Sequence, residues 1–340
     1  MREYAKAQPI ADKVVVIGGG TGQSVILGGL RKYNTDLTAI ITVADDGGSS
    51  GTLRDYLKMV PPGDIRNVMA TLSDAPKDFL KLFQYRFTDE ASFLANHTIG
   101  NLMIAAMAEQ HKDIFEAVQY LSKIMQVDGH IYPVVNEPLT LHARFTDGTE
   151  MQGEAEITDA HKKIENIWVE NERGEEPEAS PAVVNAILAA DMVILGPGSL
   201  YTSILPNISV PNVAAALRAT TAKIVYISNI MTQKGETDDF SDGDHLRVLN
   251  QQIGADVIDV MIMNSGIVPD DYVDWQKWNE ISHQVKSDPE EVKKQGAIPV
   301  LADLVELRDD GAFHNADKVA ELLQMISSDP SIQSQNISKD

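Results

Sequence analysis

The chain has 340 residues, a formal net charge of −22 at pH 7 and no cysteine. At about 100 to 200 residues per domain, this length predicts one large domain or two closely joined ones. The lack of cysteine excludes disulfides, thiolate metal sites and cysteine nucleophiles, and the negative charge argues against nucleic acid or an anionic membrane as a general partner. No apolar run approaches the ~18 residues of a membrane span, and residues 1–12 lack the apolar core of a signal peptide, so we expect a soluble, cytoplasmic protein.

The first predicted strand, residues 14–17, stops abruptly in Gly18-Gly19-Gly20-Thr21-Gly22, and a helix is predicted over residues 23–33. Glycines let the backbone approach an anion, and the first N–H groups of a helix can donate to it. This pattern predicts a loop that binds a phosphorylated ligand, beyond merely allowing a tight turn. The loop matches neither the dinucleotide fingerprint, which requires Gly or Ala where the chain has Gln23, nor the P-loop, which requires Lys at Ser24.

A second strand is predicted over residues 37–43, followed by Ala44-Asp45-Asp46-Gly47-Gly48-Ser49-Ser50-Gly51. The resulting βαβ unit should place the two glycine-rich loops side by side at the carboxyl edge of a parallel sheet. There Asp45 or Asp46 could bind ribose hydroxyls or a divalent cation. We expect Ser49 and Ser50 to act as hydrogen-bond donors. The letters G-x-S-x-G also match a nucleophile elbow, but the turn is too long after the strand and no downstream histidine has a matching context.

Helices are predicted near residues 52–59, 64–73, 77–86 and 98–126, the last broken around His111, and we interpret residues 52–126 as a helical insertion. Arg54 could reach back to a phosphate or lie in solvent beside an acidic residue. Asp64 could supply a further carboxylate or cap the helix that follows Pro61–Gly63.

The segment Asn96-His97-Thr98-Ile99-Gly100-Asn101 is typical of a loop that enters a helix. Thr98 is the expected helix cap, and Asn101 should face the ligand cleft. The eight histidines show no metal-ligand spacing, and His97 is the one that we expect at the site.

A small β excursion is predicted over residues 131–178, with a hairpin at Asp147-Gly148. An α/β alternation then returns, with helices over 182–190, 213–220 and 245–253 and strands over 192–195, 223–228 and 257–263. Polar loops follow these strands at Gly196–Ser203 and Asn229. The predicted fold class is therefore α/β, a single Rossmann-like domain over residues 10–330 with a mostly parallel sheet, followed by a frayed tail over 331–340.

Five motifs in order carry a family resemblance: residues 18–22, 44–51, 62–67, 96–101 and 196–203. In these motifs the chain resembles the YvcK (GlmR) gluconeogenesis-factor family, bacterial relatives of the phospholactate transferase CofD, from about Val14 to Leu323. The resemblance implies a cytoplasmic, Rossmann-like protein that binds UDP-N-acetylglucosamine and needs no cofactor. It also implies support of cell shape and envelope precursor supply on gluconeogenic carbon sources, together with a protein partner in precursor synthesis.

Motifs and resemblance together define the expected ligand-binding set. Its members are Gly18, Gly19, Gly20, Thr21, Gly22, Asp45, Asp46, Ser49, Ser50, Gly51, Arg54, Asp64, Asn67, His97, Asn101, Gly196, Gly198, Ser199, Tyr201, Thr202, Ser203 and Asn229.

Three functions compete, and we favour a nucleotide-sugar sensor without catalytic residues. In the transferase relatives, aspartates that match Asp46 or Asp45 and Asp64 lie near a divalent metal. The alternative is therefore a metal-dependent phosphoryl or phospholactyl transferase that uses a nucleotide-activated donor, with Mg²⁺ at Asp46 and Asp64. An NAD-dependent oxidoreductase would explain only the first βαβ unit. The sequence leaves open whether the protein forms homo-oligomers and which protein it contacts.

Overall fold

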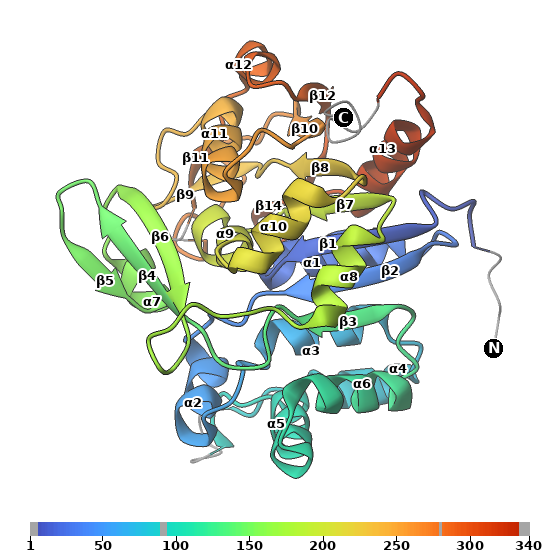
Figure 1. Cartoon of the computed structure of the whole chain (residues 1–340), viewed down its shortest axis with the longest axis vertical. Coiled ribbons are helices and arrows are strands. Elements are labelled where there is room, and N and C mark those ends of the chain that lie inside the picture. The colour runs from blue at the N-terminus through green and yellow to red at the C-terminus, as the bar shows by residue number, and fades with distance from the viewer. Residues whose placement is uncertain (1–5, 89–93, 279–280, 333–340) are drawn as a thin grey trace.

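The computed structural model describes residues 6–88, 94–278 and 281–332. Its centre is a seven-stranded parallel sheet in the order β12-β10-β8-β7-β1-β2-β3 (Figure 1). Inner strands of such a sheet are covered on both faces, which explains their continuous Val, Ile and Leu runs. The Rossmann-like α/β prediction is confirmed. The strands are β1 (Lys13–Gly18), β2 (Asp36–Ile41), β3 (His130–Pro133), β7 (Met192–Leu195), β8 (Lys223–Ile227), β10 (Val260–Asn264) and β12 (Ile298–Ala302).

Helices cover both faces of this sheet. On one face, α1 (Gly20–Leu30) packs against α3 (Gly63–Leu72) and α13 (Ala316–Ser328). On the other, α10 (Pro211–Ala219) packs against α8 (Pro181–Leu188) and α11 (Asp242–Ile253). Right-handed crossovers require this division, because the chain moves from β1 towards β3 through α1 and α3 but from β7 towards β10 through α10 and α11.

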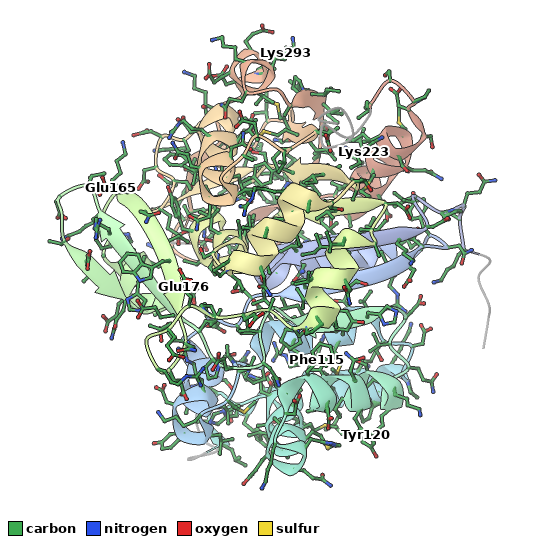
Figure 2. The ribbon with its side chains drawn as sticks, viewed as in Figure 1. Phe115, Tyr120, Glu165, Glu176, Lys223 and Lys293 are labelled. Atoms are coloured by element: carbon green, nitrogen blue, oxygen red, sulfur yellow. The ribbon has the colours of Figure 1, made fainter. Side chains whose placement is uncertain are left out.

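The helices between β2 and β3 form a crossover connection, which corrects the predicted insertion. They are α2 (Gly48–Leu57), α3, α4 (Lys77–Phe83), α5 (Ile99–His111) and α6 (Ile114–Ile124). The predicted break around His111 is confirmed. Both α3 and α6 contact β3. Phe115, labelled on α6 in Figure 2, stacks on Tyr132 with ring centroids 5.1 Å apart. These helices therefore form part of the layer that covers the sheet.

The β excursion is smaller than predicted. Strand β3 pairs in parallel with β2 and belongs to the main sheet, so the separate sheet begins at β4 (Thr140–Phe145). It continues through β5 (Glu150–Gln152), α7 (Glu154–Asp159) and β6 (Ile164–Glu170). The hairpin is confirmed, since β4 and β5 are antiparallel and Gly148 has φ +82°. A four-residue strand such as β3 carries too little pattern to reveal its sheet.

Short elements follow the main strands. They are the π-helical turn η2 (Leu200–Ile204), α9 (Leu205–Ile208), β9 (Met231–Gln233), β11 (Ile281–Gln284), α12 (Pro289–Lys294), β13 (Val305–Arg308) and β14 (Gly311–His314). Two antiparallel pairs, β9 with β11 and β13 with β14, were not predicted, because strands of three or four residues lack a readable period. Of the tail predicted to fray, residues 333–340 lie outside the described residues.

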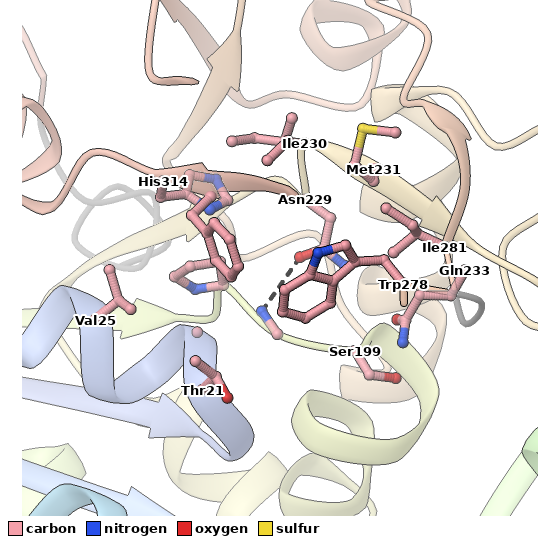
Figure 3. Close-up of a pocket in the computed structure, with 15 residues that line it drawn as sticks. Thr21, Val25, Ser199, Asn229, Ile230, Met231, Gln233, Trp278, Ile281 and His314 are labelled. Carbon is pink, nitrogen blue, oxygen red and sulfur yellow. Dashed lines mark hydrogen bonds between the residues drawn. The ribbon is translucent and has the colours of Figure 1, made fainter. Parts of the chain in front are cut away.

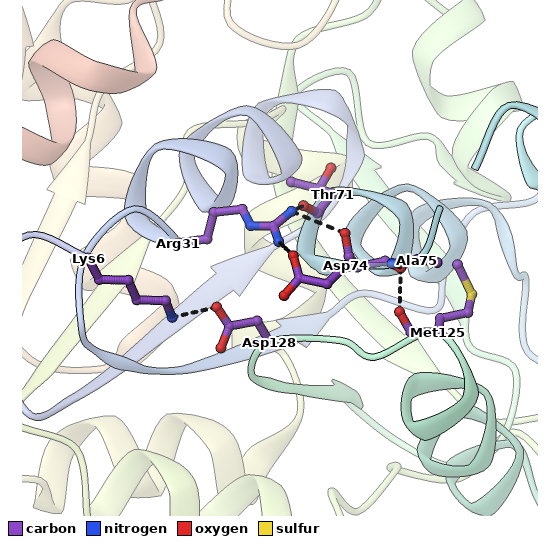
Figure 4. Close-up of polar contacts among 8 residues, drawn as sticks. Lys6, Arg31, Thr71, Asp74, Ala75, Met125 and Asp128 are labelled. Carbon is purple, nitrogen blue, oxygen red and sulfur yellow. Dashed lines mark hydrogen bonds and ion pairs between the residues drawn. The ribbon is translucent and has the colours of Figure 1, made fainter. Parts of the chain in front are cut away.

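Polar contacts join segments that are distant in sequence (Figure 4). Arg31, just after α1, donates to Asp74 Oδ1 at 2.6 Å and to the carbonyl of Thr71. Lys6 pairs with Asp128. These contacts tie the amino-terminal segment and α1 to the helices of the β2–β3 crossover. Among the described helices, none combines the length and apolar character that a bilayer crossing needs.

Candidate functional site

The two loops that follow β1 and β7 meet at the centre of the sheet. Strands β1 and β7 are neighbours, and the chain leaves them in opposite directions, which makes this the topological switch point where ligands bind in open α/β sheets. A Cβ on Gly22 would lie 2.5 Å from the carbonyl oxygen of Pro197, and one on Gly198 would lie 3.3 Å from that of Gly19. Gly22 therefore allows the two loops to touch.

Helix α1 begins at Gly20, within the glycine loop and three residues before the predicted start. Gly18 ends β1, Gly19 is extended, and Gly20 has φ +65°, a conformation that favours glycine. This places Thr21 and Gly22 in the first helical turn, where backbone N–H groups lack partners within the helix.

Gln23 replaces the glycine of a dinucleotide fingerprint with a different device. Its side chain is fully buried, and Nε2 donates to the carbonyls of Val16 (3.0 Å) and Ile40 (2.9 Å). It thereby joins β1, β2 and α1 below the glycine loop. Gln23 therefore departs from the fingerprint because it stabilises the packing of β1, β2 and α1. Thr21 and Gly22 of the glycine loop line a pocket.

Asp64 belongs to this loop and does not cap α3. Its Oδ2 accepts the N–H of Gly20 at 2.7 Å, and the N-cap position of α3 is Pro62. Asp64 is one of the first helical residues, so the capping alternative is wrong. Burial raises the pKa of Asp64 to about 6, against the hydrogen bond from Gly20.

Asp46 connects the loop after β2 to the small β sheet. Its two carboxylate oxygens accept the N–H groups of Glu154 (3.0 Å) and Ala155 (2.9 Å) at the start of α7. Asp45 accepts the N–H of Gly47 at 2.9 Å. The expected ligand role of Asp46 therefore competes with a structural one that the sequence did not reveal.

Arg54 is also engaged by the protein. Its Nη1 donates to the carbonyls of Ala44 (3.2 Å) and Asp45 (3.4 Å), and its Nη2 donates to Thr140 Oγ1 (3.2 Å). Neither sequence alternative, a phosphate ligand or a solvated arginine paired with an acid, describes these contacts. Arg54 stabilises the loop after β2.

Half-buried Glu154 and buried Glu236 lie beside these loops, and neither was predicted from the sequence. Burial raises the pKa of Glu154 to about 9, and the nearby carboxylates of Asp45 and Asp46 raise it further. Burial also raises the pKa of Glu236, which accepts Ser199 Oγ at 2.6 Å and Thr158 Oγ1 at 3.1 Å. Both residues are distant in sequence from these loops and reach them only in the folded chain, so no local motif indicates that they belong to the site.

The carboxylates do not form a metal centre in the part of the chain that the structure describes. No group of three or more Asp, Glu or His side chains there is placed to hold an ion. Both oxygens of Asp46 already accept N–H groups of α7. The donor set is a poor fit to the Mg²⁺ site expected at Asp46 and Asp64, since that ion needs free carboxylate oxygens.

The loop after β2 also carries a serine–histidine contact. Ser49 Oγ lies 2.9 Å from His97 Nδ1 and accepts Asn101 Nδ2 at 3.0 Å. Thr98 caps α5 as expected, accepting the N–H of Asn101. The prediction that no histidine suits the G-x-S-x-G turn is therefore wrong, because sequence distance hid His97 from Ser49.

The remaining predicted residues of these motifs contact their own loops. Ser50 packs against Gly63, where an added Cβ would lie 2.3 Å from its Oγ. A Cβ on Gly51 would lie 1.9 Å from the carbonyl of Asp46, so glycine is needed for the turn itself. Asn67 Oδ1 accepts Arg66 Nη2 at 2.6 Å.

Some side chains of the loop after β7 line the pocket and others lie in the core. Asn229 Oδ1 accepts the N–H of Gly198 at 3.2 Å, and Ser203 lies near Gly19. Thr202 donates to Ser199 Oγ. Tyr201 is buried against Phe240 in the π-helical turn, and its expected ligand contact stays a prediction. Gly196 has φ +75° and shapes the turn.

A pocket of about 270 Å³ opens between these loops and the two antiparallel strand pairs, β9 with β11 and β13 with β14 (Figure 3). Thr21, Ser199 and Asn229 line it, together with Trp278 and Phe313. The two aromatic rings meet edge to face, with centroids 5.2 Å apart, and Trp278 Nε1 donates to the carbonyl of Asp309 at 3.1 Å. The sequence gives no sign that Trp278 lies near Thr21, because the two residues are far apart along the chain.

His314 closes one side of this pocket as a neutral imidazole. Burial lowers its pKa to about 4, against the hydrogen bond to the carbonyl of Ser228 at 3.0 Å. Because that carbonyl is an acceptor, Nε2 carries the proton and Nδ1 is left with a lone pair. The pocket thus combines aromatic walls with polar groups of defined direction.

Comparisons with known proteins agree on the family of this chain. The family model for 2-phospho-L-lactate transferase CofD matches residues 14–305. A Lactococcus lactis protein described as "Putative gluconeogenesis factor" is 49% identical over 316 residues, 93% of this chain and 97% of the relative. A Listeria innocua "Gluconeogenesis factor" is 42% identical over 311 residues, 92% of this chain and 94% of the relative.

A crystal structure of a Bacillus halodurans protein also matches, with a TM-score of 0.87 and 38% identity over 92% of this chain and 99% of that chain. The chain belongs to the CofD family. The resemblance based on five glycine- and aspartate-containing motifs is confirmed. Within the CofD family, the relatives described above carry the name gluconeogenesis factor.

Proposed function

We propose that this member of the CofD family is a cytoplasmic gluconeogenesis factor that binds a nucleotide sugar, with UDP-N-acetylglucosamine as the expected ligand. Its role would be regulatory, supporting cell shape and envelope precursor supply during growth on gluconeogenic carbon sources. One observation carries the ligand class: at the switch point of the sheet, glycine-rich loops and the first turn of α1 adjoin an aromatic pocket of about 270 Å³.

The shape of the cleft supports a ligand with a flat base and a diphosphate. Trp278 and Phe313 offer apolar ring surface, held in place by their contact and by the carbonyl of Asp309. Thr21 and Gly22 line the same pocket from the first turn of α1, where backbone N–H groups attract anions. A base in the aromatic corner would therefore leave its diphosphate beside the glycine loop.

The buried acids do not oppose such a ligand at neutral pH. A carboxyl group with a pKa near 9, as for Glu154, is protonated at pH 7 and can donate a hydrogen bond. Asp64, with a pKa near 6, is ionised at that pH, but its Oδ2 is occupied by the Gly20 N–H. Binding without a metal ion is therefore compatible with the local charges.

The metal-dependent transferase stays the second candidate because of the same acids. Asp45, Asp64 and Glu154 influence one another electrostatically, and a divalent cation would favour their ionised forms and offset a diphosphate. The two hydrogen bonds from α7 to Asp46 count against it. Steady, metal-dependent conversion of a bound nucleotide sugar, detected by mass spectrometry, would establish the transferase.

The test of ligand class is calorimetry with UDP-N-acetylglucosamine, UDP, GDP and NAD. We expect UDP-N-acetylglucosamine to bind most tightly and to be recovered unchanged. At about 100 times its dissociation constant it should add about 2.7 kcal/mol of stability, visible as a higher melting temperature. Tighter binding of NAD or GDP would contradict the proposed ligand.

Two tryptophan variants test the aromatic corner. Stacking of a base on an aromatic side chain contributes about 1 to 3 kcal/mol, so Trp278→Ala should weaken binding roughly 10- to 100-fold. Trp275→Ala is the matched control, because Trp275 lies three residues away in the chain but outside the pocket lining. Equal affinities of the two variants would remove the base from this corner.

A further inference from the structure

The Ser49–His97–Asn101 cluster joins α2 to the start of α5 through two hydrogen bonds. An amide nitrogen can only donate, so Asn101 Nδ2 uses one lone pair of Ser49 Oγ at 3.0 Å. The hydroxyl keeps its proton and a second lone pair for the contact with His97 Nδ1, 2.9 Å away. In the tautomer of His97 that carries its proton on Nε2, Nδ1 accepts the hydroxyl proton of Ser49. The cluster thus places a serine hydroxyl beside a base.

Ser49 does not occupy the sharp strand-to-helix turn of a nucleophile elbow, because β2 ends at Ile41, but it lies in the first turn of a helix, as the residue after such an elbow does. Ser49 is the second residue of the ten-residue helix α2, and its Oγ therefore lies at a helix N-terminus. The N–H of Ser50, directly after the serine, belongs to the first helical turn and has no partner within the helix. In hydrolases with this motif, the corresponding N–H stabilises the oxyanion. Gly48 has φ +49°, and Gly51 lies too close to the Asp46 carbonyl for any side chain.

Access to the pair is asymmetric. The Ser49 side chain is 7% exposed, whereas His97 is half-buried and reachable from outside. A second buried polar atom lies at the same place: Asn101 Oδ1 has no hydrogen-bond partner among the described residues, and Asn101 is only 2% exposed. An unpaired buried acceptor is costly, so a bound group that donates a hydrogen bond would be favoured there.

We propose that Ser49 and His97 form a nucleophile–base pair that hydrolyses small carboxylic esters. Nucleophilic catalysis by serine requires an adjacent base within hydrogen-bond reach, and this pair meets that requirement. The inference does not depend on the nucleotide-sugar proposal, because it rests on contacts of α2 and α5 rather than on the aromatic pocket.

The reaction balances with water as the only co-reactant. Ser49 Oγ bonds to the ester carbonyl carbon as His97 Nδ1 takes the hydroxyl proton, and the N–H of Ser50 faces the developing oxyanion. The bond from that carbon to the alcohol oxygen breaks, and the alcohol leaves with the proton from His97. Water then attacks the acyl-serine, His97 accepts its proton and returns it to Ser49 Oγ, and the carboxylic acid departs.

The test is covalent labelling of the full chain with a fluorophosphonate, with the modified residue located by tandem mass spectrometry. We expect one label at Ser49, distinguished by fragmentation from Ser50. His97→Ala should slow labelling by about 10²- to 10⁴-fold, the range typical of a general base. Thr52→Ala is the matched control, because Thr52 is an exposed hydroxyl on the same helix bonded to the Gly48 carbonyl. It should label like the wild type.

A measurement on the unmodified protein keeps the test independent of variant folding. Hydrolysis of p-nitrophenyl acetate should show a burst equal to the labelled fraction. Labelling at Ser50 or elsewhere, no labelling of Ser49, or the lack of a burst would overturn the proposal. Calorimetry with nucleotide sugars would be unaffected by any of these outcomes.

Discussion

Replacement of Asp64 by Asn should stabilise the free protein, which is unusual for a half-buried residue at a functional loop. Desolvation raises the pKa of Asp64 from its ordinary value of 3.8 to about 6, so folding forces an ionised carboxylate into an unfavourable place at neutral pH. Asparagine keeps an oxygen that can accept the Gly20 N–H, now made at 2.7 Å, and carries no charge.

The size of this stabilisation follows from the pKa shift of Asp64. An acid whose folded-state pKa is raised binds more protons in the folded state. Its contribution to the free energy of unfolding therefore falls as the pH rises from 3.8 to about 6, and it is constant at higher pH. About two pKa units correspond to roughly 3 kcal/mol. The gain from Asp64→Asn should therefore grow from about half of this value at pH 5 to roughly 3 kcal/mol at pH 8.

Urea denaturation from pH 5 to pH 8 measures this gain directly. Asp147→Asn is the control with the opposite sign, because hydrogen bonds from Lys162 and Thr149 lower the pKa of that exposed carboxyl, and the variant should lose stability at pH 8. An Asp64→Asn protein that is less stable than the wild type at pH 8, or equally stabilised at every pH, would refute the reasoning. Nucleotide-sugar affinity should fall, since stability gained at functional sites commonly costs function.

Three further outcomes are expected. Gln23→Met should lower the free energy of unfolding by about 2 kcal/mol, measured by urea denaturation, because the carbonyls of Val16 and Ile40 lose a buried donor. Gly22→Ala should abolish nucleotide-sugar binding in calorimetry while circular dichroism stays native, since its Cβ would lie 2.5 Å from the Pro197 carbonyl and push the loops apart. EDTA should leave nucleotide-sugar affinity unchanged, and a loss of binding that Mg²⁺ restores would favour the transferase.

The central sheet could be predicted from local pattern. Strands β1, β2, β7, β8 and β10 are short apolar runs that end in Gly, Ser, Asn or Asp, and each was expected close to its observed place. A strand that is buried on both faces needs apolar side chains at consecutive positions, so it is visible in the sequence as a continuous apolar run. The glycine loop after β1 was visible for the same reason, since residues 18–22 contain four glycines.

The partners of the polar side chains could not be predicted. Asp46 accepts N–H groups more than 100 positions away, at Glu154 and Ala155, and Asp64 accepts that of Gly20. A carboxylate in a loop has the same letter whether it binds a metal, caps a helix or holds another loop. Which of these it does depends on the donors that folding brings within about 3 Å.

By itself the sequence determined the fold class, the positions of the main strands along the chain and the family, because these follow from periodicity and motifs that are local along the chain. The aromatic corner of Trp278 and Phe313, the neutral Glu154 and the Ser49–His97 pair were decided only by the tertiary structure. Each depends on contacts or burial between segments that no local pattern connects. Distance and desolvation are properties of the folded chain, and they set the chemistry of these groups.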